Sequence, residues 1–340
     1  MRYSYAVQVV REDGTEVSQV PVRIDWEPAR EWLRLKALER GLPPEEAFLL
    51  DCGFSPTWDL ERGQPFLSGF EGAGLDGDPH EAFPVGYFGE LARGITKRLV
   101  AKGTLQKGDL IRCLPVAFPE EREADSGSGG RLGRIAPPRI EIRTGSLRQL
   151  LNGDGEQKGQ PVSELPVVIP ERVFAEVAEL TLAERAERET GGVLIGHLCR
   201  DSGEARLFLT VTAQIPARHT EASSAKLTFT PATWTEVQAA LALRSRGEIM
   251  VGWWHSHPVR EWCKECPPEK RAQCALAQGF MSEDDRLLHR TVFPRAYSVA
   301  LVVNDIGEGG PTFSLFGWKK GLIEGMEFHR REEDHDARAE

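Results

Sequence analysis

The chain has 340 residues, of which 40% are apolar, and this length and composition predict about two domains with packed cores. Its formal net charge of −10 disfavours nucleic-acid binding, which requires a basic surface. No apolar run approaches the length of a membrane span, no signal peptide is visible, and the six cysteines do not follow the pattern of a secreted disulfide framework, so we expect a cytoplasmic protein.

Residues 1–118 predict a small α+β domain of unknown role. Alternating apolar residues on both sides of Glu12-Asp13-Gly14 indicate a β-hairpin. A helix is expected to follow Asp25, which can act as its N-cap. A second helix over 86–102 and a strand over 110–116 are expected to follow. A β-grasp (ubiquitin-like) fold is one possibility for this order of strands and helices.

Two stretches lack a clear periodicity. Residues 53–84 are rich in Gly, Asp and Pro and indicate a long loop or an inserted element. Residues 119–164 predict a flexible linker, because the charge run Glu120 to Glu123 is followed by the Gly/Ser stretch Ser126 to Gly130.

Residues 165–325 predict an α/β (α+β) domain, followed by a charged tail over 326–340. Apolar runs bounded by turn signals indicate strands, and apolar residues at helical spacing indicate helices. Helices are expected after Pro170 and over 231–244. The expected strands are 167–170, 191–198, 205–214, 227–229, 248–257, 297–303 and 312–318.

The strongest chemical signal is a pair of histidines, His255 and His257, at positions i and i+2 of a predicted strand. Side chains at this spacing point to one face of the strand, so both imidazoles can reach one metal ion. Asp285 offers a carboxylate further along the chain, and Glu189 stands at the mouth of an apolar strand. Two histidines, an aspartate and a glutamate that is not a ligand are the parts of a catalytic zinc hydrolase, in which three protein ligands leave one position open for water.

The combination of Glu189 with Gly191-Gly192, His255-Ser256-His257-Pro258 and Ser282-x-x-Asp285 resembles the JAMM (MPN+/JAB) zinc metallopeptidase family over about residues 165–320. The resemblance implies a JAB/MPN-like, cytidine-deaminase-like curved sheet with flanking helices. It also implies one catalytic Zn²⁺ and hydrolysis of amide or isopeptide bonds. Members of the family often act directly after the C-terminal Gly-Gly of a ubiquitin-like protein.

The same resemblance implies a role for each matched side chain. Zinc would be held by His255, His257 and Asp285. Glu189 would act as the general base toward water and then as the proton donor to the leaving amine. Ser282 would donate a hydrogen bond to the oxyanion.

The residues next to the histidine pair have predicted orientations. Ser256 is expected to face away from the metal. Trp253 and Trp254 alternate faces, so we expect one of them in the core and the other along the substrate groove.

The segment Pro258 to Met281 is longer than the corresponding gap in the family. It carries three cysteines in the C-x2-C-x7-C spacing typical of metal ligands, Cys263, Cys266 and Cys274. We expect a second, structural Zn²⁺ site with Cys199, His289 or another side chain as the fourth ligand, an iron–sulfur cluster being the weaker metal alternative, or else three free thiols. In each case the segment is expected to wall the active-site cleft.

These observations predict a zinc-dependent metallopeptidase or isopeptidase that acts on a ubiquitin-like protein or its conjugates, with an activating (E1-like) protein as a partner and with no nucleic-acid or membrane partner. Alternatives are a small-molecule or peptide-fragment amidase, including a sulfur-carrier-processing enzyme, and a non-catalytic scaffold of the same fold. The N-terminal domain would recruit substrate or partner. If it is a β-grasp domain, self-processing at Gly129-Gly130 is a further alternative.

Overall fold

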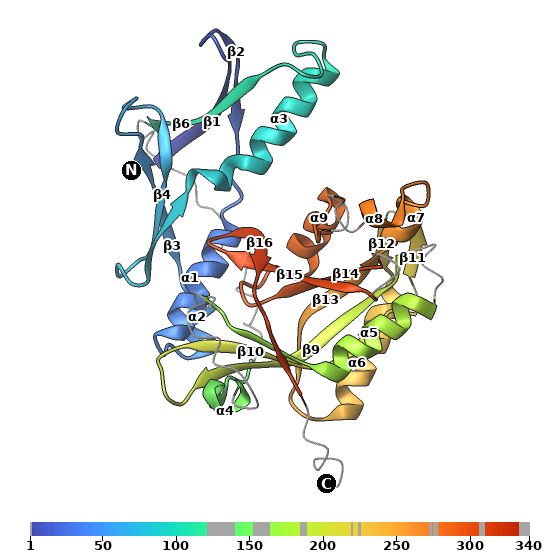
Figure 1. Cartoon of the computed structure of the whole chain (residues 1–340). Helices are drawn as coiled ribbons and strands as arrows, with labels where there is room; N and C mark the ends of the chain where they lie inside the picture. Colours follow the sequence, from blue (N-terminus) through green and yellow to red (C-terminus); the bar gives the residue numbers. More distant parts are fainter. Residues whose placement is uncertain are drawn as a thin grey trace. The chain divides into compact units, whose positions relative to one another are not determined.

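The computed structural model describes residues 2–120, 140–151, 164–183, 189–218, 220–223, 226–271, 274, 278–305 and 310–332. The chain divides into two units (Figure 1). The first comprises residues 1–37, 45–138 and 320–322, and the second comprises residues 38–44, 139–319 and 323–340. None of the described helices is long and apolar enough to cross a membrane.

The first unit contains the predicted hairpin, β1 (Arg2–Arg11) and β2 (Glu16–Val22), in a sheet of order β2-β1-β6 with β6 (Ile111–Glu120). On one face Val7 and Val9 pack with Ile95 and Leu99 of α3 (Gly89–Ala101), which buries an apolar core. The α+β composition is confirmed. The β-grasp alternative is not supported, because β1 and β6 pair antiparallel, whereas a β-grasp sheet pairs its first and last strands in parallel.

The stretch predicted as a long loop or an inserted element is not a loop, because it forms an antiparallel sheet of β3 (Cys52–Trp58), β4 (Leu67–Gly74) and β5 (His80–Pro84). Its aromatic side chains pack on one another, with the rings of Phe70 and Phe83 stacked at 4.7 Å. A Cβ at Gly69 would lie 2.3 Å from the carbonyl oxygen of Phe83. Glycines here allow the strands to approach closely. The high glycine content of this stretch therefore reflects the tight packing of a small sheet and not a loop.

Both helices predicted for the N-terminal part are present, together with a short helix, α2 (Pro44–Ala47), that is not predicted. The predicted helices are α1 (Glu27–Glu39) and α3, and a short 3-10 turn, η1 (Val85–Phe88), precedes α3. The helix expected after Asp25 is α1. The backbone N–H of Glu27, its first residue, donates a hydrogen bond to the Asp25 carboxylate.

A mixed sheet organises the second unit, in the order β16-β15-β14-β13-β9-β10-β8-β17, with β7 beside β9. β13 pairs antiparallel with β9 and parallel with β14, so the C-terminal ends of β13 and β14 meet at one edge of the sheet. A separate hairpin joins β11 (Thr220–Ser223) and β12 (Lys226–Phe229). The strands of the sheet are β7 (Arg143–Gly145), β8 (Val167–Pro170), β9 (Gly191–Asp201), β10 (Leu207–Pro216), β13 (Ile249–His257), β14 (Val299–Asn304), β15 (Thr312–Lys319), β16 (Leu322–Met326) and β17 (His329–Arg331).

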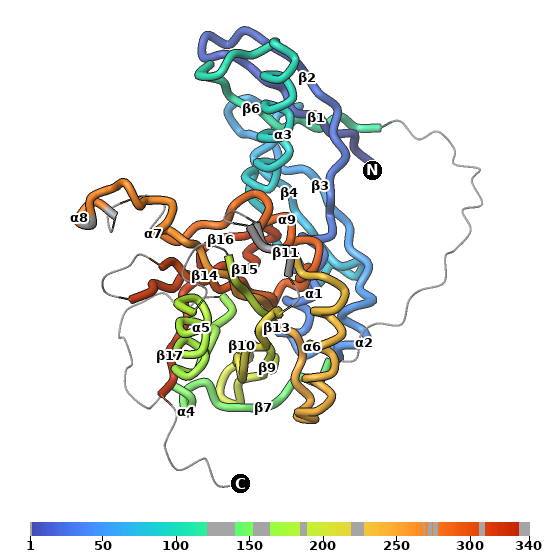
Figure 2. The backbone as a smooth tube through the Cα atoms, turned by 90° about the vertical axis from the view of Figure 1, so that its right-hand side faces the viewer, coloured from blue at the N-terminus to red at the C-terminus, as the bar shows by residue number. Residues whose placement is uncertain are grey.

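Helices cover both sides of this sheet. Figure 2 shows α5 (Glu171–Ala183) and α6 (Pro231–Arg244) on opposite sides of β9, β10 and β13. α5 buries Val173, Phe174 and Val177, because apolar residues at i, i+1 and i+4 lie on one helix face. The remaining helices are α4 (Leu147–Leu151), α7 (Val259–Trp262), α8 (Pro268–Arg271) and α9 (Glu283–Val292). The predicted curved sheet with flanking helices is confirmed.

Two segments outside the predicted 165–325 domain contribute to its sheet. β7 and α4 lie in the stretch expected as linker, and β17 lies in the stretch expected as charged tail. β17 pairs in parallel with β8, which explains why residues 329–331 are ordered despite their charge. The Gly/Ser stretch, including Gly129-Gly130, and residues 333–340 lie outside the described residues.

Candidate metal centre

Two imidazoles converge at the end of β13. His255 and His257 lie on the same strand face, as their spacing predicts, and both are fully buried. Their Nε2 atoms are 3.0 Å apart. The strand therefore presents two nitrogen ligands toward one point.

The N-terminus of α9 delivers a carboxylate to the same point. Ser282 is the N-cap of α9: its Oγ accepts a hydrogen bond from the Asp285 backbone N–H at 3.1 Å, and the Asp285 Oδ2 accepts one from the Ser282 backbone N–H at 2.7 Å. This reciprocal capping box fixes the Asp285 side chain. Its Oδ2 lies 3.5 Å from the Nε2 of His255 and 3.8 Å from the Nε2 of His257.

These three side chains fit a zinc ion. Their ligand atoms lie within 4.8 Å of one another and all three residues are buried. Burial raises the pKa of Asp285, but the adjacent His255, the hydrogen bonds with both histidines and the capping bond from Ser282 outweigh it and hold the pKa well below its ordinary value. A charged carboxylate and two imidazoles are a ligand set that zinc prefers when one position is kept open for chemistry.

Glu189 stands beside the cluster because β9 and β13 are tied together just before Gly191. The Ser256 backbone N–H donates to the Thr190 carbonyl at 2.8 Å, and the Thr190 N–H donates to the Ser256 Oγ at 2.9 Å. The Ser256 side chain thus binds the backbone of the segment before β9 and faces away from the candidate metal position, as predicted. The register pairs His255 with Gly191, which places Glu189 at the level of the candidate metal ligands.

The environment of Glu189 changes its acidity. Its side chain is 5% exposed, and its Oε2 has no hydrogen-bond partner among the described residues. Burial raises the pKa of Glu189 to about 7, partly offset by His255 and reinforced by Asp285 and Asp284. A carboxyl group with a pKa near neutrality can both accept and return a proton, which is the requirement for general acid–base catalysis at neutral pH.

A comparison with protein families matches residues 170–261 to the family described as prokaryotic homologs of the JAB domain. The chain contains a JAB-family domain. The matched range includes Glu189 and both histidines and ends before Asp285. We refer to the second unit as the JAB domain.

Among solved structures, the JAB-containing chain is similar to the solution structure of protein DSY2949 from Desulfitobacterium hafniense, with 19% identity and a TM-score of 0.35. The match covers 50% of this chain and 97% of that chain. The search of curated proteins found no match.

Three further residues support the candidate ligands of the JAB domain, and one of them, Asn304, has no role in the sequence-based predictions. Asn304, at the end of β14, places its Oδ1 3.2 Å from the Nδ1 of His257, which leaves Nε2 to face the metal position. The ring of Trp253 stacks on His255 at 4.5 Å, and its Nε1 donates to the Nδ1 of His289 at 3.1 Å. Burial lowers the pKa of His289, so this histidine is neutral and accepts that bond.

The prediction that one tryptophan lines a groove is wrong. Trp253 and Trp254 are both fully buried, because both faces of this part of the sheet are covered. Trp254 donates from Nε1 to the Oε1 of Gln214 at 3.2 Å and lies over Gly192, where a Cβ would sit 2.5 Å from that nitrogen. The second glycine of Gly191-Gly192 is therefore explained by packing.

The cysteine-bearing segment gathers its thiols around Cys263. The Sγ atoms of Cys263 and Cys274 are 3.9 Å apart, and the exposed Cys266 also forms a side-chain hydrogen bond with Cys263. Among the described residues, only the His255, His257 and Asp285 group has three ligand atoms in mutual reach, so a second metal site stays a prediction. The two suggested fourth ligands are engaged elsewhere: Cys199 lies against Thr210, and His289 binds Trp253.

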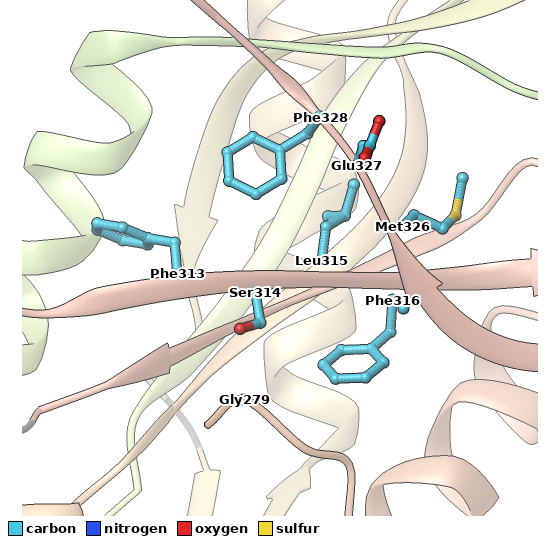
Figure 3. A pocket seen from close by; sticks show the side chains of 9 residues that line it. Gly279, Phe313, Ser314, Leu315, Phe316, Met326, Glu327 and Phe328 are labelled. Carbon is cyan, nitrogen blue, oxygen red and sulfur yellow. The ribbon is translucent and has the colours of Figure 1, made fainter. Parts of the chain in front are cut away.

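A pocket of about 570 Å³ lies along β15 and the residues at the end of β16 (Figure 3). Gly279 forms one edge, with Ser314 directed toward it, and the neighbouring Phe280 places its ring 4.6 Å from that of His257. The pocket is lined by Gly279, Phe313, Ser314, Leu315, Phe316, Gly325, Met326, Glu327 and Phe328. Among the described residues, the pocket is thus connected to the candidate ligands only through Phe280, the neighbour of Gly279.

We expect Ser282→Ala to lower the free energy of unfolding by about 1 kcal/mol, because it removes the side-chain half of the capping box. Ser282→Thr keeps the hydroxyl and is expected to stay near wild type. Urea unfolding of the three proteins measures the difference. Equal stability of Ser282→Ala and wild type would contradict the capping role.

The raised pKa of Glu189 predicts a pH-dependent stability in chelator-treated protein. The folded state binds this proton more tightly than the unfolded chain, so the contribution of Glu189 to stability is fully present below about pH 4.5 and is lost as the pH rises through about 7. Glu189→Gln cannot ionise. The free energy of unfolding of Glu189→Gln, relative to that of wild type, is therefore expected to rise by up to about 3 kcal/mol between pH 5 and pH 8. Urea unfolding at each pH measures it. Parallel pH profiles of the two proteins would refute the burial of this carboxylate.

Proposed function

We propose that the JAB domain is a zinc-dependent metallopeptidase or isopeptidase. The observation that carries this proposal is the convergence of His255, His257 and Asp285 with the buried, proton-retaining Glu189 alongside. A structural metal site needs four protein ligands and no base, whereas three ligands and an adjacent carboxyl group suit hydrolysis.

Each side chain has a distinct task in this proposal. His255, His257 and Asp285 hold a zinc ion, which supplies Lewis-acid activation of water at neutral pH. Glu189 accepts the proton of the attacking water as its oxygen bonds to the carbonyl carbon, and then returns that proton to the leaving amine. Ser282 keeps its O–H for the developing oxyanion, because its capping role uses the oxygen only as an acceptor.

We further propose that the scissile bond follows the C-terminal Gly-Gly of a ubiquitin-like protein or its conjugate, with an activating (E1-like) protein as a functional partner. A chain that ends in two glycines is narrow enough to pass the rings of Phe280 and Trp262, which lie close to each other and to the ring of His257. The apolar pocket of Figure 3 then suits side chains that precede the glycines.

The test uses the zinc-loaded full chain and peptides that end in Gly-Gly joined by an amide bond to a fluorophore. We expect release of the fluorophore, its loss on addition of a chelator, and recovery when zinc is restored. Peptides ending in Ala-Ala serve as the matched substrate control. Cleavage that persists in chelator would overturn the metal mechanism, and equal cleavage of both peptides would overturn the Gly-Gly assignment.

A further inference from the structure

His289 lies one helical turn beyond Asp285 on α9, and both side chains are buried. Residues at positions i and i+4 of a helix lie on one face, so α9 presents both side chains to β13. The Oδ2 of Asp285 is 3.5 Å from the Nε2 of His255, and the Nδ1 of His289 is 3.1 Å from the Nε1 of Trp253. The helix therefore contacts β13 at two levels.

The spacing of these two contacts matches between the helix and the strand. Four residues of a helix advance by about 6 Å, and the two strand residues from Trp253 to His255 advance by about 6.6 Å along one face. A single contact would allow α9 to rotate about that point. Two contacts one turn apart fix both its rotation and its position along β13, and with them the place of the Asp285 carboxylate.

Trp253 carries this restraint to a candidate ligand. Its fully buried ring stacks on that of His255, with the centroids 4.5 Å apart and the planes 14° apart. An indole N–H can only donate, so the Nδ1 of His289 is the acceptor. Because a hydrogen bond has a preferred direction, the bond to His289 limits how far the indole can turn against His255.

The position of His289 is set by further contacts of α9. The ring centroid of His289 lies 5.4 Å from that of Trp318 and 6.2 Å from that of Phe293. Trp318 donates to the Phe293 carbonyl at 3.0 Å, and Arg286 donates to the Ile323 carbonyl at 2.8 Å. These bonds tie α9 to β15 and β16, whereas the bond of His289 ties it to β13, the strand that carries both candidate histidine ligands.

The hydrogen bond explains why an imidazole stands at this buried position. Burial disfavours the charged form and lowers the pKa of His289 to about 3, so the ring is neutral at physiological pH. An apolar side chain would fill the space without this loss of hydration, but it would leave the buried N–H of Trp253 without its acceptor. A buried bond of fixed direction specifies one register between two packed elements.

We propose that His289 is a positioning residue of the candidate metal centre, which acts through Trp253 to hold Asp285 and His255 in the relative position that a zinc ion requires. His289 is not itself a ligand in this role, because its Nδ1 is engaged by Trp253. The role rests on the zinc site of the proposed function and adds to it a residue that sets zinc affinity without touching the metal.

Competition with a chromophoric chelator, in the absence of any peptide, measures the zinc dissociation constant of the full chain. His289→Leu removes the acceptor and keeps an apolar side chain. It is expected to weaken zinc binding by about tenfold or more, the effect typical of losing a residue that supports metal ligands. His289→Asn can place its amide oxygen where the Nδ1 lies, and is expected to stay within about threefold of wild type.

Trp253→Phe examines the same bond from the donor side, so the proposal can be tested even if His289→Leu does not fold. It keeps a ring to stack on His255 and is also expected to weaken zinc binding by about tenfold. The two changes combined should weaken binding by less than the product of their separate effects, because neither partner is then left unsatisfied.

Cobalt substitution supplies a second readout, since the visible absorption of bound Co²⁺ reports the geometry of its ligands. The spectrum is expected to change in His289→Leu and in Trp253→Phe, and to match wild type in His289→Asn. A spectrum that is the same in all four proteins would overturn the positioning role.

Val177→Ala is the control for lost stability, because Val177 is buried in α5 and lies outside the ligand group. Its truncation leaves a cavity in the same domain and is expected to preserve zinc affinity. Wild-type affinity in both His289→Leu and Trp253→Phe, or equal weakening by His289→Asn or Val177→Ala, would overturn the proposal. A wild type that binds no zinc would overturn it together with the proposed function. A wild type that binds zinc, shows these variant effects and cleaves no Gly-Gly peptide would overturn the proposed function alone.

Discussion

Glu189→Gln is expected to lower kcat for amide hydrolysis by about 10²- to 10⁴-fold, the range typical for loss of a general base. The substituted amide would keep the shape of the side chain but could not accept the proton of the attacking water. The zinc content should not change, because Glu189 is not one of the convergent ligands. Steady-state kinetics with the Gly-Gly peptide, together with metal analysis of the same samples, measure both quantities.

The matched control for this change is Glu179→Gln on α5, which removes a carboxylate of the same domain that lies outside the ligand group. It is expected to retain wild-type kcat. If Glu189→Gln retained wild-type kcat with full zinc occupancy, another group would have to move the proton and the mechanism proposed for Glu189 would be wrong.

His257→Ala is expected to remove one zinc per chain and to abolish amide hydrolysis. Two ligands would remain, and zinc sites of this kind need three. The change would also leave the Oδ1 of Asn304 without the bond to His257, so some loss of stability is expected. Zinc is measured by elemental analysis after dialysis, and the fold by circular dichroism.

His329→Ala provides the comparison, since His329 lies in β17 of the same domain and outside the ligand group. It is expected to keep both zinc and activity. A His257→Ala protein that is folded and retains the wild-type zinc content would show that the zinc is held elsewhere, with the cysteine segment as the first place to look.

The ligands themselves are predictable from sequence because they rest on local geometry. Side chains at i and i+2 of a strand must share a face, which fixes the relation of His255 and His257. The capping box likewise couples Ser282 to Asp285 within one helical turn. The place of Glu189 follows less directly, since it depends on the register of β9 against β13.

Residues whose roles depend on long-range pairing are harder to predict. Asn304 reaches His257 only because β14 runs parallel to β13, so that the two strands end side by side. The sequence signal that could have pointed to Asn304 is a polar residue at the end of an apolar strand, as in Val303-Asn304-Asp305. His289 can be placed on the Asp285 face of α9 by its i+4 spacing, but its partner Trp253 cannot.

Glycine content misleads where small sheets pack tightly. The composition of residues 53–84 predicts a long loop or an inserted element and indicates no strand, yet β3, β4 and β5 pair there and bury Phe70 and Phe83. β7 and β17 show the same limit for short strands, since three residues carry no detectable alternation and are ordered by the sheet they join.

X-ray absorption at the zinc edge, on a chain in which Cys263, Cys266 and Cys274 are replaced by Ser, tests the metal centre most directly. The expected result is one zinc per chain with a shell of nitrogen and oxygen neighbours at about 2.0–2.1 Å. Because the thiols of the insert are absent, a shell of this kind assigns the ion to His255, His257 and Asp285. Failure of this variant, still folded, to retain any zinc would contradict the account.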